Sequence, residues 1–421
     1  MKSKIISTCL IFILFMCFSA LAQEKLLVLK NTSFIDVEKG KVIANVDIVI
    51  NGPLIQNIDK HSPEIQYANA HVIDLEGSYV IPGLIEGHTH ISSIPETSLT
   101  IALKHGVTAL RDMAGDGEYL KLLQEAVESG ELIGPDIYFS ALMGGRELIE
   151  KDSRIKISTP PNYKLGEAPW MRLVNENSDI PRIIQDAKNC GAIGIKIYAY
   201  LPYELVKKLA DEAKKQGLKV WAHWMVYPAT PEDVVNSGVE VVSHIYFLLT
   251  PPDWDYKDGS KVLSASYLDP DRNEKLFAAM RTKNIILDPT IVVSREMFSS
   301  VMDKKKVQEL NDTFYNIVKA AYVNGVKISA GTDIFLPKNE NSKLPLHDEI
   351  EALVTKVGLS PLDAIMAATI INAEILGIDN TQGSIKVGKI ANLVVLRDNP
   401  LIDIHNIEKV KFVLKNGKII N

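Results

Sequence analysis

The residues best suited to bind a metal ion are histidines at the ends of short apolar segments. His88 and His90 are separated by one residue and close such a segment. Side chains two positions apart in a β-strand lie on the same face, so both imidazoles would point to one side. Imidazole nitrogen is a common ligand for zinc and related ions. Two histidines with this spacing often have no function when they occur alone, so the interpretation needs support from other residues.

That support comes from three further residues. His223, His244 and Asp333 each end an apolar run with the composition of a buried strand. If these strands are parallel and neighbouring, their carboxyl ends meet at one mouth of the fold. If there were no metal site, the presence of residues that can bind metal at the ends of four separate strands would be a coincidence. The set therefore predicts a metal site.

Lys196 is unusual because it lies within an apolar strand, at residues 194–198. An unpaired ammonium group is costly in such surroundings, and a lysine is ordinarily exposed or salt-bridged. Here the side chain would face the histidines, which favours a functional role. Reaction with CO2 would convert the amine into a carbamate, an anion able to bridge two metal ions. Tyr198 shares this face, and two interpretations stay open for it: a substrate or oxyanion contact, or core filling.

These residues belong to a repeated pattern of strands and helices. Amphipathic helices, such as those expected at 118–128 and 203–216, alternate with short apolar strands. Strands are expected at 81–90, 107–114, 136–142, 194–199, 219–224, 241–245, 284–291 and 327–333. Eight strands in this alternation predict an α/β fold of the (β/α)8 TIM-barrel type.

Two long connections interrupt the pattern, at 143–178 and 246–271. Both follow strands, so we expect them on the catalytic face of the barrel. Their role is left open: the aromatic residues of the second could cap a substrate pocket or cover the barrel rim. The adjacent Arg111 and Asp112 are interpreted as a structural salt bridge, and support of the metal ligands from behind is the alternative.

Both ends of the chain have a different character, with short strand-like pieces and turn residues such as Asn51-Gly52 and Asn416-Gly417. We therefore predict a small β-sandwich domain built from residues 23–80 together with 380–421. The TIM barrel would occupy residues 81–379.

The first 22 residues have the features of a signal peptide. Lys2 and Lys4 precede an apolar run at 5–18, and Ala20-Leu21-Ala22 offers a cleavage site. The run is shorter than the roughly 20 residues that a membrane span needs, although an anchor is the alternative. We expect cleavage before Gln23 and a secreted product, periplasmic or extracellular, with no stable membrane anchor.

The composition excludes several other classes. Hydrophobic residues make up 46% and charged residues 23%, as in an ordinary globular protein. Lys and Arg total 46 against 52 Asp and Glu, so no basic surplus exists to bind nucleic acid. Outside the predicted signal peptide Cys190 stands alone, which excludes a disulfide within the chain. The expected partner is a small-molecule substrate, and the sequence leaves open whether the chain forms a homo-oligomer.

Taken in order, these motifs resemble the amidohydrolase superfamily, in particular its secreted imidazolonepropionase-like and prolidase-like members. The resemblance covers nearly the whole chain after residue 22. It rests on residues 82–90, 106–112, 191–198, 222–223, 243–244, 331–333, 367–369, 372–373 and 388–393. Glu86 and Asn392 stand where the family more often has aspartate, and neither is a metal ligand in the family.

The resemblance implies a binuclear centre of divalent metal ions, usually zinc. One ion would be more buried, the other more exposed, and a hydroxide would bridge the two. Two cations lower the pKa of the bridging water, so that hydroxide exists at neutral pH. Asp333 could take its proton and pass it to the leaving nitrogen. The ligands implied are His88, His90 and Asp333 for the buried ion, His223 and His244 for the exposed ion, and carboxylated Lys196 between them.

The leading hypothesis is therefore hydrolysis of a C–N amide bond in a small substrate, such as a dipeptide or an N-acyl amino acid. A mononuclear deaminase or a cyclic-amide hydrolase of the same superfamily is the alternative. Such deaminases typically have a glutamate a few residues beyond the fifth-strand histidine, whereas Trp224, Met225 and Val226 follow His223. A catalytically dead binding protein is a third hypothesis, but dead relatives normally lose ligands and all six are present.

Overall fold

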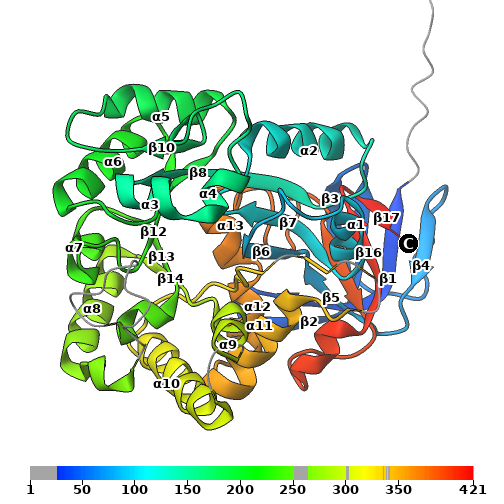
Figure 1. Ribbon diagram of the computed structural model, residues 1–421. Coiled ribbons are helices and arrows are strands. Elements are labelled where there is room, and N and C mark those ends of the chain that lie inside the picture. The colour runs from blue at the N-terminus through cyan, green and yellow to red at the C-terminus, as the bar shows by residue number, and fades with distance from the viewer. Residues whose placement is uncertain are drawn as a thin grey trace, which may run out of the picture.

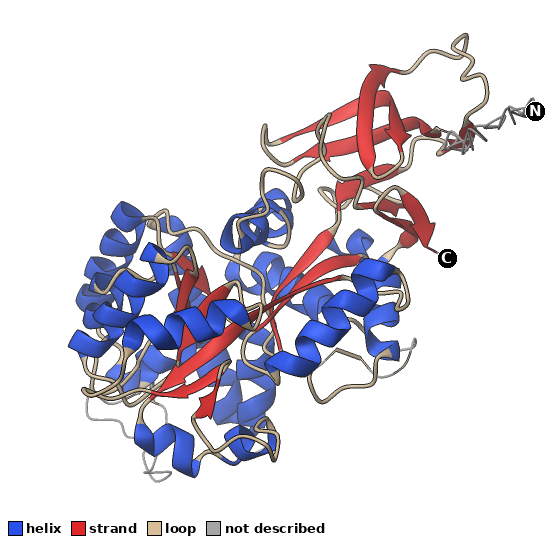
Figure 2. Cartoon of the chain, turned by 90° about the horizontal axis from the view of Figure 1, so that it is seen from above, coloured by secondary structure: helices blue, strands red, loops and turns tan. Residues whose placement is uncertain are grey.

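The computed structural model describes residues 26–250, 264–299, 303–334, 336–337, 339 and 342–420. It consists of a helix-covered barrel and a smaller sheet that lies at one end of the molecule (Figures 1 and 2). None of the helices in these ranges combines the length and apolar character that a membrane span needs. The predicted signal peptide and residues 251–263 of the second insertion lie outside the described residues. Cleavage and export therefore stay predictions.

Seven neighbouring parallel strands form the barrel wall, and most of their residues are buried. Strands covered on both faces consist of continuous apolar runs, which explains why the sequence pattern found them. In order around the wall they are β6 (Leu84–Thr89), β7 (Val107–Asp112), β8 (Asp136–Gly144), β11 (Gly194–Ile197), β12 (Lys219–His223), β13 (Val241–Ser243) and β14 (Ile286–Asp288).

The eighth predicted strand, 327–333, needs a correction. It makes an isolated parallel bridge from Ile328 to Leu287 on β14 and is otherwise irregular. On its other side the amide of Asp333 donates to the carbonyl of His88 at 2.7 Å. The amide of Thr332 donates to the same carbonyl at 3.1 Å, and Asp333 has a left-handed backbone with φ 54°, so no regular ladder forms with β6. The segment still closes the barrel between β14 and β6.

Amphipathic helices cover the outside of this wall. The helix α6 (Tyr203–Lys215) buries Leu205, Val206, Leu209, Ala210 and Ala213, the spacing expected of one helical face. The other helices of the layer are α1 (Thr97–Lys104), α2 (Gly117–Ser129), α5 (Ile180–Asn189), α7 (Pro231–Asn236), α8 (Pro270–Lys283), α10 (Lys304–Val323), α11 (Pro345–Ala352), α12 (Pro361–Ala367) and α13 (Ile370–Leu376).

Short elements follow the carboxyl ends of three strands and surround the barrel mouth. After β8 come α3 (Arg146–Lys151), α4 (Ser153–Ile157), β9 (Glu167–Ala168) and β10 (Met171–Leu173). After β13 comes the short helix η1 (Ile245–Leu249), and after β14 comes α9 (Ile291–Ser299). The two insertions thus begin where the barrel prediction placed them.

The two ends of the chain form one hydrogen-bonded sheet of eight strands with its own hydrophobic core. This confirms a β unit built from both termini. The prediction was a sandwich, and the hydrogen-bonded strands form one continuous sheet.

The predicted strand 81–90 is divided at Gly83, where a Cβ would lie 2.1 Å from the hydroxyl of Thr108. The strands of the eight-stranded sheet are β1 (Leu27–Asp36), β2 (Lys41–Asn51), β3 (Leu54–Lys60), β4 (His71–Asp74), β5 (Tyr79–Pro82), β15 (Leu393–Leu396), β16 (Val410–Lys415) and β17 (Lys418–Ile420).

Candidate metal centre and active site

The end of β6 holds His88 in a fixed orientation. Its Nδ1 donates to Oδ2 of Asp288, at the end of β14, across 2.6 Å. With its proton on Nδ1, the imidazole presents a lone pair on Nε2, which lies 3.5 Å from Oδ1 of Asp333. A carboxylate behind a histidine is the usual means of orienting a metal ligand. Burial lowers the pKa of His88, although Asp288 and Asp333 oppose this effect.

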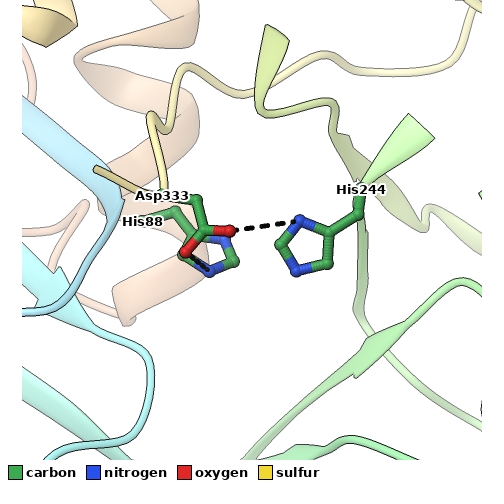
Figure 3. A group of neighbouring side chains, drawn as sticks. All are labelled: His88, His244 and Asp333. Atoms are coloured by element: carbon green, nitrogen blue, oxygen red, sulfur yellow. Dashed lines mark ion pairs between the residues drawn. The ribbon is translucent and has the colours of Figure 1, made fainter. Parts of the chain in front are cut away.

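Asp333 stands between the histidines. Its Oδ1 accepts from Nε2 of His90 at 3.0 Å, and its Oδ2 lies 3.7 Å from Nδ1 of His244. Figure 3 shows His88 and His244 converging on the same carboxylate. Each of these three residues offers one ligand atom, and the three atoms all lie within 4.8 Å of one another. Two imidazoles and a carboxylate fit a zinc-type ion.

The histidines of β12 and β13 complete the group. The imidazole ring centres of His223 and His244 are 4.7 Å apart. Burial, together with neighbouring positive charge, lowers the pKa of His223 well below its ordinary value. Burial does the same for His244, where Asp333 opposes it. Both rings are therefore neutral at pH 7 with a lone pair available, the form that binds metal.

Lys196 lies behind these ligands in a chain of buried hydrogen bonds. Its Nζ donates to Oγ of Ser243 at 2.7 Å, and that hydroxyl donates to Oδ2 of Asp288 at 2.9 Å. Lys196 has no exposed surface, and burial lowers its pKa to about 7. A large fraction of neutral amine therefore exists near neutral pH. That is the form able to react with CO2.

Arg111 joins the same network, which corrects the predicted pairing within Arg111-Asp112. Its Nη2 donates to Oδ2 of Asp288 at 3.3 Å, and its guanidinium lies 4.6 Å from the ring centre of Trp221. Asp112 instead accepts from the backbone amides of Ile91 and Ala114. Asp288 is thus the counter-ion of buried Arg111, and it also accepts hydrogen bonds from His88 and from the Ser243 hydroxyl that binds Lys196.

Glu86 ties the first strand to the closing segment. Its carboxyl group, whose pKa burial raises to about 8, accepts from the amides of His88 and Thr332, each at 3.0 Å, and from the Thr332 hydroxyl. This joins the backbone beside two of the predicted ligands. The longer side chain at a position where the family more often has aspartate thus has a structural role in this chain.

Three residues at the site share an uncommon backbone conformation. His244, Thr290 and Asp333 have φ values of 74°, 49° and 54°. Left-handed backbone costs of the order of 1–3 kcal/mol at a residue other than glycine, and such strain concentrates at functional sites. Hydrogen bonding of Nδ1 of His244 to the hydroxyl of Thr290, at 3.0 Å, holds two of the three together.

Tyr198 lies against these ligands on the cavity side. Its ring centre is 4.3 Å from that of His223, and its hydroxyl donates to the carbonyl of Met113 at 2.8 Å. Burial raises the pKa of this phenol, with Asp333 adding to the effect, so the hydroxyl is protonated at neutral pH. Both interpretations of Tyr198 therefore stay open.

A cavity of about 480 Å³ opens above the group. Its wall combines four of the predicted ligands with Tyr198, Tyr246 and residues of α4 and α9. A cavity of this size suits a small molecule. The four ligands that line it are His90, His223, His244 and Asp333.

The predicted ligands are therefore brought together, with Lys196 behind them. Sequence reasoning missed Asp288, Ser243 and Thr290, which hold His88, Lys196 and His244. A signal was present for Asp288, because it is a carboxylate inside the apolar strand predicted at 284–291, although the observed strand β14 ends at this residue. The spacing of residues in the sequence could not show that Asp288 accepts a hydrogen bond from a predicted metal ligand.

Comparison with known proteins identifies the family of the chain. The model of the amidohydrolase family matches residues 79–420. Ochratoxinase of Aspergillus niger is 27% identical over 359 residues, which cover 76% of this chain and 66% of that protein. Imidazolonepropionase of Pseudomonas savastanoi is 24% identical over 377 residues, covering 85% of this chain and 88% of that protein.

Solved structures share the fold. A crystal structure described as a Xaa-Pro dipeptidase with methionine bound in its active site has a TM-score of 0.72 and 22% identity, and it covers 94% of this chain and 99% of its own. The family match, which spans the barrel and the C-terminal strands, gives the classification. The chain belongs to the amidohydrolase family.

Proposed function

We propose that the protein is a metal-dependent hydrolase that cleaves a C–N amide bond in a small substrate, a dipeptide or an N-acyl amino acid. The observation that carries this proposal is the convergence of His88, His244 and Asp333 within 4.8 Å at a cavity of about 480 Å³. The names of the relatives support the reaction class, because ochratoxinase, imidazolonepropionase and a Xaa-Pro dipeptidase are all hydrolases of C–N bonds.

The proposal includes a centre of two divalent ions, in keeping with the number of donors. A bound divalent ion lowers the pKa of water and polarises a carbonyl oxygen. Zinc suits the imidazole-rich donor set. The residues that would hold the ions are His88, His90, His223, His244, Asp333 and a carbamate formed on Lys196.

Asp333 is the proposed proton carrier. Burial would raise its pKa, but His88, His90 and His244 outweigh this and lower the pKa well below the ordinary range. Its carboxylate is therefore ionised at neutral pH and can accept the proton that water gives up on attacking the amide. The same oxygen can then deliver the proton to the leaving nitrogen, which departs poorly as an anion.

Two other residues have proposed roles. A carbamate on Lys196 would place a negative charge beside the histidines, and the buried neutral amine supports its formation. Tyr198 would donate a hydrogen bond from its hydroxyl to the carbonyl oxygen of the substrate as negative charge develops there. In that case its hydroxyl would leave its present acceptor, the carbonyl of Met113, and donate to the substrate instead.

Deamination fits the site less well. The positions after His223 are occupied by Trp224, Met225 and Val226, each at most 2% exposed and none able to carry a proton. A ring-protonating acid would therefore have to come from elsewhere in the cavity wall.

The test combines metal content with a substrate screen. Purified protein should contain about two divalent ions per chain and hydrolyse N-acetyl-leucine or dipeptides. A chelator should abolish this activity and zinc should restore it. Absence of metal together with absence of turnover would contradict the proposal. Ammonia release from aminated heterocycles, without amide hydrolysis, would instead identify a deaminase.

A further inference from the structure

The cavity wall carries a positive charge that the proposed chemistry does not use. Among the described residues that line the cavity, Arg154 is the one lysine or arginine. It belongs to α4 in the insertion after β8, while the predicted ligands come from the barrel strands. Its side chain is 76% exposed, so a molecule in the cavity can reach it.

Asp152 holds this guanidinium by one edge. Nε of Arg154 donates to both carboxylate oxygens at 3.0 and 3.1 Å, and Nη2 donates to Oδ2 at 2.5 Å. Asp152 is itself fixed, because it accepts from the backbone amide of Arg154 and begins the helix. Among the described residues no hydrogen bond reaches Nη1. A guanidinium has five donors, so its Nη1 and Nη2 edge can take a second carboxylate in a bidentate pair.

Much of the rest of the cavity wall is apolar. An apolar group in the cavity would meet Leu142, Ile155, Ile157, Met171, Val293 and Met297. Ile157 and Met297 are unusually exposed for apolar side chains, at 76% and 40%. Exposed apolar side chains that gather at a cavity mark a surface that a ligand covers.

We propose that Arg154 selects substrates with a free carboxylate, which it binds through its unoccupied edge while the apolar wall takes a branched alkyl group. The inference rests on the proposed function in taking this cavity as the substrate site. It goes further by assigning a residue and by narrowing the substrate to an N-acyl amino acid, or a dipeptide, with an apolar C-terminal residue.

Hydrolysis of two matched probes tests the assignment. N-acetyl-leucine and N-acetyl-isopentylamine have the same acyl and branched alkyl groups, but the second lacks the carboxylate. The preference for the acid, measured as the ratio of kcat/KM values, should fall about 10- to 100-fold in Arg154→Gln, mainly through KM. Arg154→Lys should retain part of the preference, since lysine has the positive charge but cannot form the bidentate pair of hydrogen bonds that a guanidinium forms. An unchanged ratio in Arg154→Gln would overturn the inference.

The matched control is Arg146→Gln. Arg146 lies in the same insertion, is 63% exposed and pairs with Glu150, but it does not line the cavity. This variant should keep the wild-type ratio. A fall equal to that of Arg154→Gln would show that the insertion as a whole, and not the guanidinium of Arg154, sets the preference, and would overturn the assignment.

Binding separates this inference from the proposed reaction. Calorimetry on the protein as purified should show that 4-methylpentanoate binds at least 10-fold more tightly than 4-methylpentanamide, and that Arg154→Gln removes the difference. If neither N-acetyl probe is hydrolysed and this pattern still appears, the proposed function fails while the assignment of Arg154 stands. Wild-type protein without preference for the acid, or a preference that persists in Arg154→Gln, overturns the assignment.

Discussion

The floor and the rim of the cavity are built in opposite ways. The floor consists of residues at or near strand ends that are mostly buried, although His90 and Asp333 keep 27% and 17% of their side chains exposed. Lys196 and Asp288 have no exposed surface, whereas Arg154 and Ile157 on the rim are each 76% exposed. Strands of the barrel supply the floor, and the short helices after β8 and β14 supply the rim.

This difference indicates a division of labour. Removing one partner from a buried charge network leaves other charges unpaired, which typically costs 3–5 kcal/mol. Such a floor tolerates little change and suits the chemistry that a family shares. Exposed side chains on a short insertion can be exchanged at little cost in stability. Variation in substrate among relatives should therefore be found at the rim.

The largest expected effect is at Lys196. Lys196→Arg should reduce amide hydrolysis to background, because a guanidinium cannot form a carbamate and keeps its positive charge beside the metal ligands. Lys196→Ala should lose metal and regain some activity with added short-chain carboxylic acids, which can occupy the vacated space. Metal analysis and native mass spectrometry of the carbamate provide the measurements.

The control for Lys196 is Lys207→Arg, which changes an exposed lysine paired with Asp211 on α6. That variant should be as active as the wild type. Full activity in either Lys196 variant would show that this lysine is structural only.

Asp333→Asn is expected to have the next largest effect. Loss of a general acid–base group typically lowers the rate about 10²- to 10⁴-fold. The loss should be greater for an amide than for an activated ester, because an amine needs a proton in order to leave. Comparison of kcat on both substrates, with metal content measured in parallel, is the test. Equal losses on both would remove the proton-carrier role.

Tyr198→Phe distinguishes the two interpretations of the tyrosine. If the hydroxyl stabilises the oxyanion, kcat should fall about 10²-fold. We expect this result, because Tyr198 lines the cavity beside His223. If the side chain only fills the core, kcat should stay constant and the variant should lose about 1 kcal/mol of unfolding free energy, the usual value of the lost hydrogen bond to Met113. Kinetics and thermal unfolding on one preparation decide.

Asp288→Asn tests the floor at a residue that is not itself a predicted ligand. Replacing the carboxylate that orients His88 should weaken metal binding about 10- to 100-fold. It also leaves Arg111 buried without its counter-ion, so unfolding free energy should fall by about 3–5 kcal/mol. Competition with a chromogenic chelator gives the affinity. Unchanged affinity in a destabilised variant would confine Asp288 to a structural role.

The same contrast explains what the sequence could predict. His88, Lys196, His223, His244 and Asp333 were found because each lies in or ends an apolar run, and the barrel brings strand ends together. These are local signals combined with one topological rule. The α/β architecture and the β unit from both termini follow from the same signals.

What the sequence could not predict is which buried groups bond to which. Arg111 and Asp112 are adjacent in the sequence, yet Arg111 pairs with Asp288, 177 positions away. The position of the eighth strand was predicted correctly, but its irregular form was not. That form depends on hydrogen bonds from Thr332 to Glu86 and from the Asp333 amide to His88 on β6. Rim residues carry no periodic pattern, so Arg154 could not be distinguished from any surface arginine.

The smallest expected effect is on the rim, at Ile157. Ile157→Ser removes an exposed apolar surface that a branched substrate would cover, and loss of roughly 1 kcal/mol of apolar contact corresponds to about a 5-fold rise in KM. The rise should appear for N-acetyl-leucine and not for N-acetyl-glycine, with kcat unchanged, because Ile157 belongs to α4 and is neither a proposed ligand nor a proton carrier. Ile402→Ser is the control, since Ile402 is 82% exposed and does not line the cavity. A fall in kcat instead would mean that the rim also shapes the floor, and the division between the two regions would not hold.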